Sequence, residues 1–235
     1  MIQTWKNIKS SFSNLLYLAY PDLCLICGTS LINDEPIICY DCLYKLPQTA
    51  FHSYSENPAA ERFYGKICFN YATAAFHYQK GSAMQIILEA LKYKGESKVG
   101  DFLGSYSGQK LMGKGFFDSI DMIIPVPLHQ MKLKSRGFNQ SEVIARGLSK
   151  ACNIEVDCKT LLRKNDNKTQ TTRNIYDRWK NVSSIFTVEN KDVFMNKHIL
   201  LVDDVLTSGS TLEACGQKVL ESSGSQISFF ALALA

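Results

Sequence analysis

The sequence predicts an α/β protein in which helices flank a parallel sheet, with a small cysteine-rich module before it. Strand-like and helix-like segments alternate over most of the chain. One apolar run, residues 199–202, leads into two aspartates, a loop of hydroxyl residues and a helical pattern. Two Cys-x-x-Cys pairs stand near the N-terminus. With 46% apolar and 20% charged residues, the composition is that of a globular protein.

The N-terminal segment, residues 4–20, places apolar residues at helical spacing and predicts a short amphipathic helix that ends before Pro21. A peripheral membrane helix is the alternative, but the polar face carries only Lys6 and Lys9. No apolar run approaches the roughly 20 residues that span a bilayer, and no signal peptide is recognisable. We therefore expect a cytoplasmic protein without a membrane span. The net charge of +4 permits an anionic ligand without indicating nucleic-acid binding.

The two Cys-x-x-Cys pairs can each point two sulfurs at one centre. They comprise Cys24, Cys27, Cys39 and Cys42. Two such pairs complete a tetrahedral thiolate site, and four protein ligands leave no open position, which favours structural zinc. A thiol redox pair is the alternative, but redox chemistry needs no second copy of the motif. The other four cysteines are scattered among apolar residues, which is typical of a reducing compartment.

The remaining organisation follows from apolar periodicity. We expect residues 1–50 to form the N-terminal helix and zinc module, residues 51–66 a linker, and residues 67–235 the main domain. Within that domain, strands are predicted within residues 67–78, 120–126, 185–188, 199–202 and 227–234. Helices are predicted from Gly81, over residues 102–112 and around Ile144 and Leu148. We expect residues 163–180 to form a basic loop, because they include almost no apolar residues.

A second basic loop follows the strand that ends at Pro125 and Pro127. It contains His129, Lys132, Lys134 and Arg136 and leads into the helix around Ile144. Ligands of open parallel sheets bind at the carboxyl ends of the strands, so this loop should lie near the two aspartates.

The stretch from Ile199 to Thr211 is the strongest indication of a ligand. Ser210 and Glu213 form a capping-box pattern at the start of a helix. Backbone N–H groups there, with Gly209 and the neighbouring hydroxyls, would cradle a phosphate, whereas the two aspartates would repel it. A sugar phosphate such as ribose 5-phosphate resolves the conflict, because its hydroxyls can donate to the carboxylates. An ordinary strand whose acids cap a turn is the alternative interpretation.

This stretch resembles the phosphoribosyl-pyrophosphate (PRPP) motif of the type I phosphoribosyltransferases: four apolar residues, two acids and a Thr/Ser-Gly-Ser/Thr loop. The resemblance implies that Asp203 and Asp204 hold the ribose 2′- and 3′-hydroxyls. It also implies that the 5′-phosphate is held by Thr207, Ser208, Gly209, Ser210 and Thr211. Members commonly have Thr-Thr-Gly where this chain has a serine at 208, which keeps the hydroxyl.

Nearly the whole chain resembles the competence protein F (ComF) family, which combines a double zinc ribbon with a type I phosphoribosyltransferase domain. The shared features are the four cysteines, Leu-Lys-Tyr-x-Gly, Pro-Val-Pro-Leu, Arg-Gly-Phe-Asn-Gln, a basic Thr-Gln loop and the PRPP motif. The resemblance implies a pyrophosphate loop containing Val126 and Pro127, with Arg136 nearby. It implies a flexible closing loop containing Thr169, Gln170, Arg173 and Arg178. Lys168 stands where members often have proline.

Two functions follow from these expectations. The first is Mg²⁺-dependent transfer of a phosphoribosyl group to or from a nucleobase-like acceptor, with PRPP or a ribose phosphate as ligand. The second is a non-catalytic module that senses PRPP or a nucleotide. It would bind single-stranded DNA or a protein of the competence machinery through the zinc module and basic loop. The family resemblance links both to DNA uptake in natural transformation.

Overall fold

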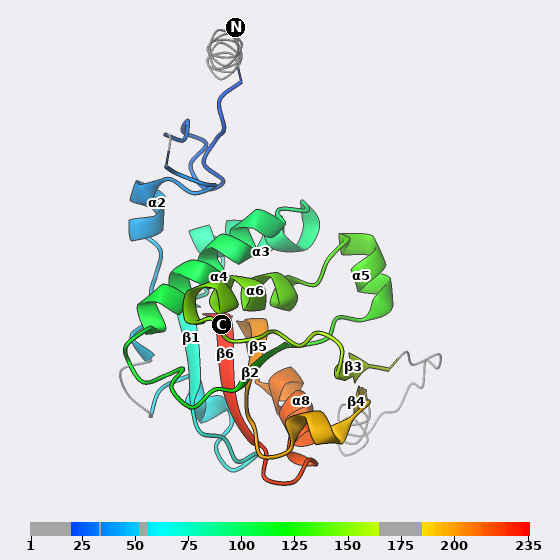
Figure 1. Cartoon of the computed structure of the whole chain (residues 1–235). Coiled ribbons are helices and arrows are strands. Elements are labelled where there is room, and N and C mark those ends of the chain that lie inside the picture. The colour runs from blue at the N-terminus through cyan, green and yellow to red at the C-terminus, as the bar shows by residue number, and fades with distance from the viewer. Residues whose placement is uncertain (1–19, 33, 52–55, 165–184) are drawn as a thin grey trace, which may run out of the picture. The chain divides into compact units, whose positions relative to one another are not determined.

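The computed structural model describes residues 20–32, 34–51, 56–164 and 185–235 (Figure 1). The chain divides into two compact units, Met1–Leu46 and Pro47–Ala235. The helix predicted over residues 4–20 lies outside the described residues except for its last residue. Among the helices that the structure does describe, none is long and apolar enough to cross a membrane.

The described residues of the first unit contain little regular structure. An antiparallel bridge pairs Leu23 with Ser30, and the short helix α2 spans Tyr40–Tyr44. Its apolar interior consists of few side chains, among them Leu31 and Ile38. A unit of this size buries too little apolar surface to be stable by itself, so it needs a disulfide, a metal or a partner.

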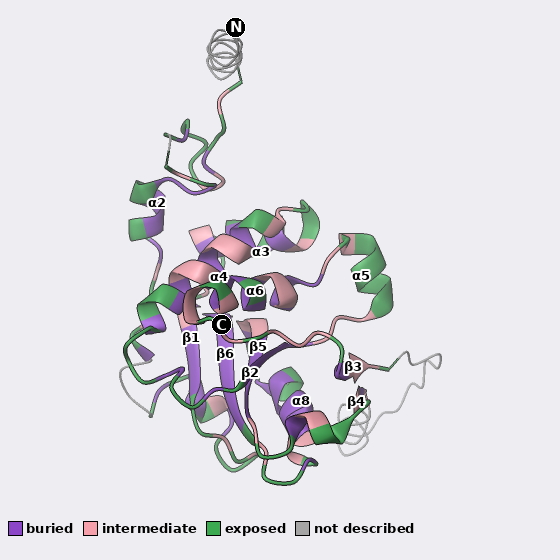
Figure 2. Ribbon diagram, in the orientation of Figure 1, coloured by how far each residue is buried: buried purple, intermediate pink, exposed green. Residues whose placement is uncertain are grey.

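The second unit is built on a parallel sheet of four strands in the order β1-β6-β5-β2. The strands are β1 (Ala72–His77), β2 (Met122–Pro125), β5 (His198–Leu206) and β6 (Gln226–Leu234). All three pairings are parallel, which confirms the predicted α/β class. The central strands are buried along most of their length (Figure 2), because both faces of the sheet are covered.

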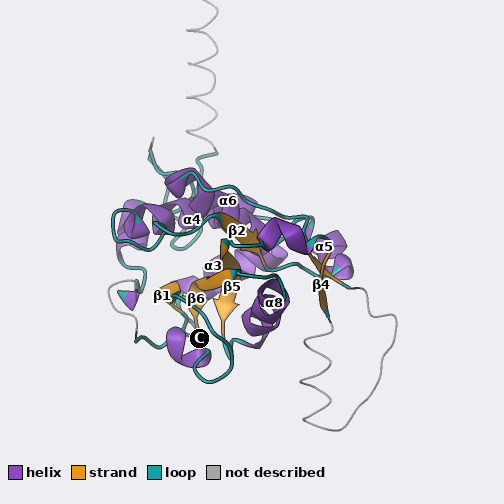
Figure 3. Ribbon diagram, turned by 60° about the horizontal axis from the view of Figure 1, so that its bottom comes forward, coloured by secondary structure: helices purple, strands orange, loops and turns teal. Residues whose placement is uncertain are grey.

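Helices cover the sheet on both faces (Figures 1 and 3). Helices α4 (Ser97–Leu111) and α6 (Gln140–Cys152) lie together on one face, and α3 (Ala83–Tyr93) packs against α4. Helix α8 (Ser210–Leu220) covers β5 and β6 from the other face. The helices expected from Gly81, over residues 102–112 and around Ile144 are therefore present.

Helices α4 and α6 approach each other through glycines. A Cβ atom added at Gly147 would lie 2.3 Å from the carbonyl oxygen of Asp101, and one at Gly104 would lie 2.4 Å from that of Ile144. Only hydrogen fits at these two positions. The contact matters for function because α6 begins beside the carboxyl ends of β2 and β5.

The segment expected to be a linker is part of the second unit. The 3-10 helix η2 (Ala60–Arg62) leads into Phe63, which is fully buried and stacks on Phe229 at a ring-centroid distance of 4.1 Å. Pro58 and Gly65 suggested an irregular connection, but the intervening Ala59, Ala60 and Phe63 supply apolar surface that the sheet buries.

The strand predicted within residues 185–188 is present, whereas three other elements differ from the expectation. Helix α5 (Gln130–Arg136) lies where the sequence predicted a basic loop. Because none of its residues is buried, the sequence has no apolar periodicity there that would indicate a helix. The antiparallel pair of β3 (Leu161–Arg163) with β4 (Phe186–Val188) flanks residues 165–184, which are outside the described residues. The 3-10 helix η3 (Lys191–Phe194) connects β4 to β5.

Candidate functional site

The two acids lie on β5 itself. The strand was expected to end at Val202, but it continues to Leu206, where Val205 and Leu206 pair with Ala233 and Leu234 of β6. Because β2 ends earlier, at Pro125, the acids project beyond that neighbouring strand.

Each acid has a defined partner. The hydroxyl of Ser141, in the first turn of α6, donates to Oδ1 of Asp203 at 2.9 Å, and the backbone N–H of Asp204 donates to the same oxygen at 2.8 Å. Lys92 Nζ, near the end of α3, lies 3.0 Å from Asp204 Oδ2. Helices on one face of the sheet therefore hold both carboxyl groups in place.

Burial changes the ionisation of the Asp203 carboxyl group. Burial first, and the neighbouring charge of Asp204 second, raise the pKa of Asp203 to about 7, although Ser141 and Lys92 oppose the shift. Asp203 therefore gains its charge near neutral pH. A ligand that donates hydrogen bonds to this pair stabilises the charged form.

The loop after β5 forms an open hollow lined by Asp203 and residues 205–212. Gly209 has φ +82°, and a Cβ there would lie 3.0 Å from the Phe63 ring, so glycine is required for conformation and for space. The hydroxyls of Thr207, Ser208, Ser210 and Thr211 belong to exposed residues around this glycine.

The capping box predicted at Ser210 and Glu213 does not form. Gly209 is the N-cap of α8, no side chain caps the helix, and Glu213 is buried with its carboxylate accepting from Gln217. The Ser210 N–H donates a long hydrogen bond to Ser208 Oγ at 3.5 Å. An uncapped helix start presents its first N–H groups to the hollow, which suits an anion.

The carboxyl end of β2 lies beside the acids. The Val126 N–H donates to the Val202 carbonyl at 2.9 Å, and the Asn139 side chain, which also caps α6, donates to the Val126 carbonyl at 2.9 Å. Pro127 follows and is partly exposed. The expectation that the segment after β2 neighbours the acidic strand agrees with this geometry.

Arg136 is held at the end of α5. Its Nη1 donates to the Gln140 side chain at 2.8 Å, and its guanidinium carbon lies 5.6 Å from the centre of the Tyr93 ring. The residues assigned to the closing loop, Thr169, Gln170, Arg173 and Arg178, lie outside the described residues.

Three residues of this site were not assigned by the sequence analysis: Lys92, Asn139 and Ser141. Lys92 belongs to the Leu-Lys-Tyr-x-Gly segment and Asn139 to Arg-Gly-Phe-Asn-Gln, so both were noticed without a role. Ser141 carries no local signal, because a serine in the first turn of a helix is ordinary.

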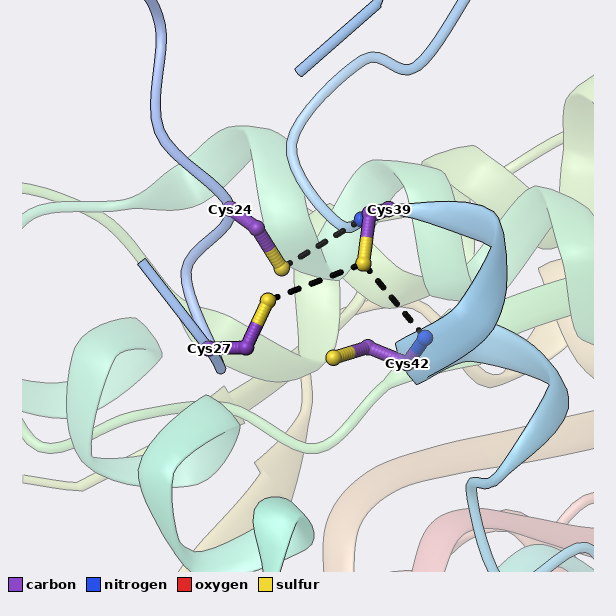
Figure 4. Close-up of side chains that lie close together, drawn as sticks. All are labelled: Cys24, Cys27, Cys39 and Cys42. Atoms are coloured by element: carbon purple, nitrogen blue, oxygen red, sulfur yellow. Dashed lines mark hydrogen bonds between the residues drawn. The ribbon is translucent and has the colours of Figure 1, made fainter. Parts of the chain in front are cut away.

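The four cysteines of the first unit come together (Figure 4). Their sulfur atoms all lie within 4.8 Å of one another, and Cys27 Sγ is 3.7 Å from Cys39 Sγ. Disulfide sulfurs are about 2.0 Å apart. The edge of a tetrahedron with metal–sulfur distances of about 2.3 Å is about 3.8 Å. The separation therefore fits two ligands of one metal ion, and the four cysteines could bind zinc.

Backbone and hydroxyl groups support the cysteine sulfurs. The Cys39 N–H points to Cys24 Sγ at 3.3 Å, and the Cys42 N–H points to Cys39 Sγ at 3.5 Å. Hydrogen bonding by Thr29 lowers the pKa of Cys27 to about 6, whereas burial raises the pKa of Cys42 above its usual value. Donors aimed at sulfur stabilise thiolates, which are the form that binds metal.

Comparison with known proteins finds relatives that match about half of the chain and one that matches most of it. The chain is 31% identical to competence protein F of Haemophilus influenzae over 116 residues, which cover 49% of this chain and 51% of that protein. It is 31% identical to the DNA utilization protein YhgH of Escherichia coli O157:H7 over 112 residues, 48% of each chain. These matches span about half the length of the curated relatives. Competence protein ComFC of Bacillus subtilis matches at 23% identity over 85% of this chain and 89% of that protein. Over these ranges, the chain is similar in sequence to proteins named for competence and DNA utilization.

No protein-family profile matches this chain. Among solved structures, it is similar to glutamine PRPP amidotransferase from B. subtilis, with a TM-score of 0.43 and 15% identity, over 61% of this chain and 30% of that one. A hypoxanthine phosphoribosyltransferase from Staphylococcus aureus matches with a TM-score of 0.37 and 9% identity, over 59% of this chain and 74% of that one. Because both TM-scores are low, the fold class of this chain rests on the sheet topology described above.

Proposed function

We propose that this protein binds PRPP and transfers a phosphoribosyl group to or from a nucleobase-like acceptor. One observation carries the proposal: an acidic pair and an uncapped helix start stand at opposite ends of the short segment 203–210, at the carboxyl edge of a parallel sheet. Ligands of such sheets bind at this edge.

The polarity of the segment supports a sugar phosphate. Carboxylates accept hydrogen bonds from hydroxyl groups, and the N–H groups at the start of α8 bind phosphate. A phosphate without a sugar would bring its charge towards Asp203 and Asp204 with no hydroxyl groups to compensate. Ribose 5-phosphate carries hydroxyls at one side and phosphate at the other, so PRPP satisfies both ends.

The chain would act mainly by positioning the ligand and neutralising charge. Asp203 and Asp204 would accept from the ribose hydroxyls, while residues 207–211 would bind the 5′-phosphate. Val126, Pro127 and Arg136 would face the pyrophosphate that leaves the anomeric carbon. Thr169, Gln170, Arg173 and Arg178 would close over it and exclude water. A carboxylate pair beside substrate phosphates suits Mg²⁺, which when bound would neutralise pyrophosphate charge.

The proposal is tested by calorimetric titration of PRPP with Mg²⁺ into the wild type and into the double variant Asp203→Asn/Asp204→Asn. The titration is done at pH 8, because the Asp203 carboxyl group, whose pKa is raised to about 7, is then mostly charged in the wild type. Hydrogen bonds to charged groups contribute about 1.5–3 kcal/mol each, so the variant should bind on the order of 100-fold more weakly.

The exposed Asp118→Asn provides a matched control and should bind as the wild type does. Melting curves of all three proteins must show that the variants are folded. A wild type that does not bind PRPP, or a double variant that binds it equally well, contradicts the proposal. Binding that depends on the pair justifies a screen of nucleobases for transfer.

For the first unit, we propose that Cys24, Cys27, Cys39 and Cys42 hold one structural zinc ion. The sulfur separation of 3.7 Å and the N–H groups aimed at sulfur support this assignment. Four cysteines fill the coordination sphere, so the ion would contribute to folding and not to catalysis.

A second candidate function, binding of single-stranded DNA, is favoured by helix α5. Met131, Lys132 and Lys134 are all exposed on a helix with no buried residue. The names of the E. coli relatives refer to DNA utilization. We expect an oligo-dT to bind weakly, with a log K against log salt slope of about −0.7 for each phosphate contacted.

The variant Lys132→Gln/Lys134→Gln should make that slope less steep by about one or two units, whereas Lys110→Gln on α4 should leave it unchanged. Fluorescence anisotropy of a labelled oligonucleotide over a salt series measures both. If the wild type shows no binding at low salt, this second function is wrong.

A further inference from the structure

The C-terminal end of α3, Leu91–Tyr93, touches both ends of the site. Lys92 Nζ lies 3.0 Å from Asp204 Oδ2, at the proposed ribose end. The Tyr93 ring lies 5.6 Å from the guanidinium carbon of Arg136, at the proposed pyrophosphate end. The Gln140 side chain connects Arg136 to the end of α3, because it accepts a hydrogen bond from Arg136 and donates one to the Leu91 carbonyl at 3.4 Å.

The ion pair between Lys92 and Asp204 differs from the other ion pairs among the described residues. Its side chains are 24% and 15% exposed, whereas each of the others has at least one side chain 40% exposed or more. Exposed pairs are screened by solvent and contribute little, but a pair that is mostly enclosed holds its geometry.

This pair occupies a carboxylate that the bound sugar also requires. A ribose hydroxyl that donates to Asp204 would compete with the ammonium for Oδ2 or share the carboxylate with it. In PRPP the pyrophosphate is attached to the carbon next to the one that bears the 2′-hydroxyl. Anionic oxygens would therefore arrive close to Lys92 as the hydroxyls engage the acids. The flexible four-carbon stem of Lys92 lets its ammonium group move from the Asp204 carboxylate to the pyrophosphate oxygens.

We infer that Lys92 is a ligand-contacting residue that balances the charge of Asp204 in the free site and pairs with the pyrophosphate of the bound ligand. It thereby selects a ribose phosphate that carries pyrophosphate over one that does not. The inference rests on the proposed function, and it assigns a role to a residue that neither the acidic pair nor the phosphate loop includes.

The test compares two ligands, PRPP and ribose 5-phosphate, each titrated with Mg²⁺ into the full-length chain. Lys92→Met keeps the length of the side chain and removes its charge. We expect it to weaken PRPP binding at least 10-fold and to change ribose 5-phosphate binding less than 3-fold. Lys92→Arg, which keeps the charge, should retain most of the PRPP affinity. Lys94→Met, at an exposed position two residues away, is the matched control.

Other outcomes overturn the inference. If Lys92→Met weakens both ligands equally, the lysine acts only by supporting the acidic pair. If it weakens neither, the lysine does not contact the ligand. Loss of PRPP binding in Lys92→Arg as well as in Lys92→Met shows that shape, and not charge, matters. A wild type that binds neither ligand is a distinct result: it ends the proposed function together with this inference.

Discussion

Replacing Cys39 with serine is expected to remove the metal from the chain and to unfold Met1–Leu46. Cys39 lies 3.7 Å from Cys27 Sγ, accepts from the Cys42 N–H and caps α2, so its loss affects the whole cluster. Structural zinc contributes about 10–16 kcal/mol to the folding of small modules, far more than a unit of this size can replace. Elemental analysis should find one zinc per chain in the wild type and almost none in the variant.

Cys68→Ser is the control for this experiment, because Cys68 is an exposed cysteine outside the cluster. It should keep the full zinc content. Limited proteolysis should cut the Cys39→Ser variant within its first 46 residues and spare the second unit. A wild type without zinc whose four cysteines react freely with thiol reagents would favour the redox interpretation.

The second large effect is expected at the contact between α4 and α6. In Gly147→Ala the new methyl group would lie 2.3 Å from the Asp101 carbonyl oxygen and 2.8 Å from the Ser105 nitrogen. Both neighbours are backbone atoms, which cannot rotate away, so the helices must separate. We expect a loss of about 3–5 kcal/mol, or roughly 6–20 °C in Tm, measured by thermal and denaturant unfolding.

Gly100→Ala is the matched control on α4. Its nearest obstacles are the ends of the Leu91 and Val143 side chains, at 2.9 and 3.3 Å, which can rearrange. Alanine also favours the helix by up to about 1 kcal/mol, so the net change should be small. If Gly147→Ala had the same Tm as the wild type, the contact between α4 and α6 would have room for the extra methyl group, which contradicts this prediction. A shifted α6 would also displace Ser141 from Asp203 and so weaken the PRPP binding that we propose.

Several features of the two candidate sites were predictable because they depend on residues that are close together in the sequence. The four cysteines lie in two short Cys-x-x-Cys turns. They cluster once the eleven residues between Cys27 and Cys39 fold back. The strand, acidic pair and glycine loop from Ile199 to Thr211 form one continuous segment, so the topology of strand, loop and helix was predicted correctly. The predicted capping box was wrong. The N-cap of α8 is Gly209, in the left-handed conformation, and no serine side chain caps the helix.

The sequence alone determined the fold class, the cysteine cluster and the segment that carries the acidic pair, because each depends on periodicity or spacing along the chain. Only the tertiary structure decided what surrounds that segment. Ser141 reaches Asp203 across 62 positions, Lys92 comes from α3 to Asp204, and Phe63 from the supposed linker lies against Gly209. Such contacts depend on the order of the strands and on the packing of α4 against α6, and no local pattern of residues encodes either.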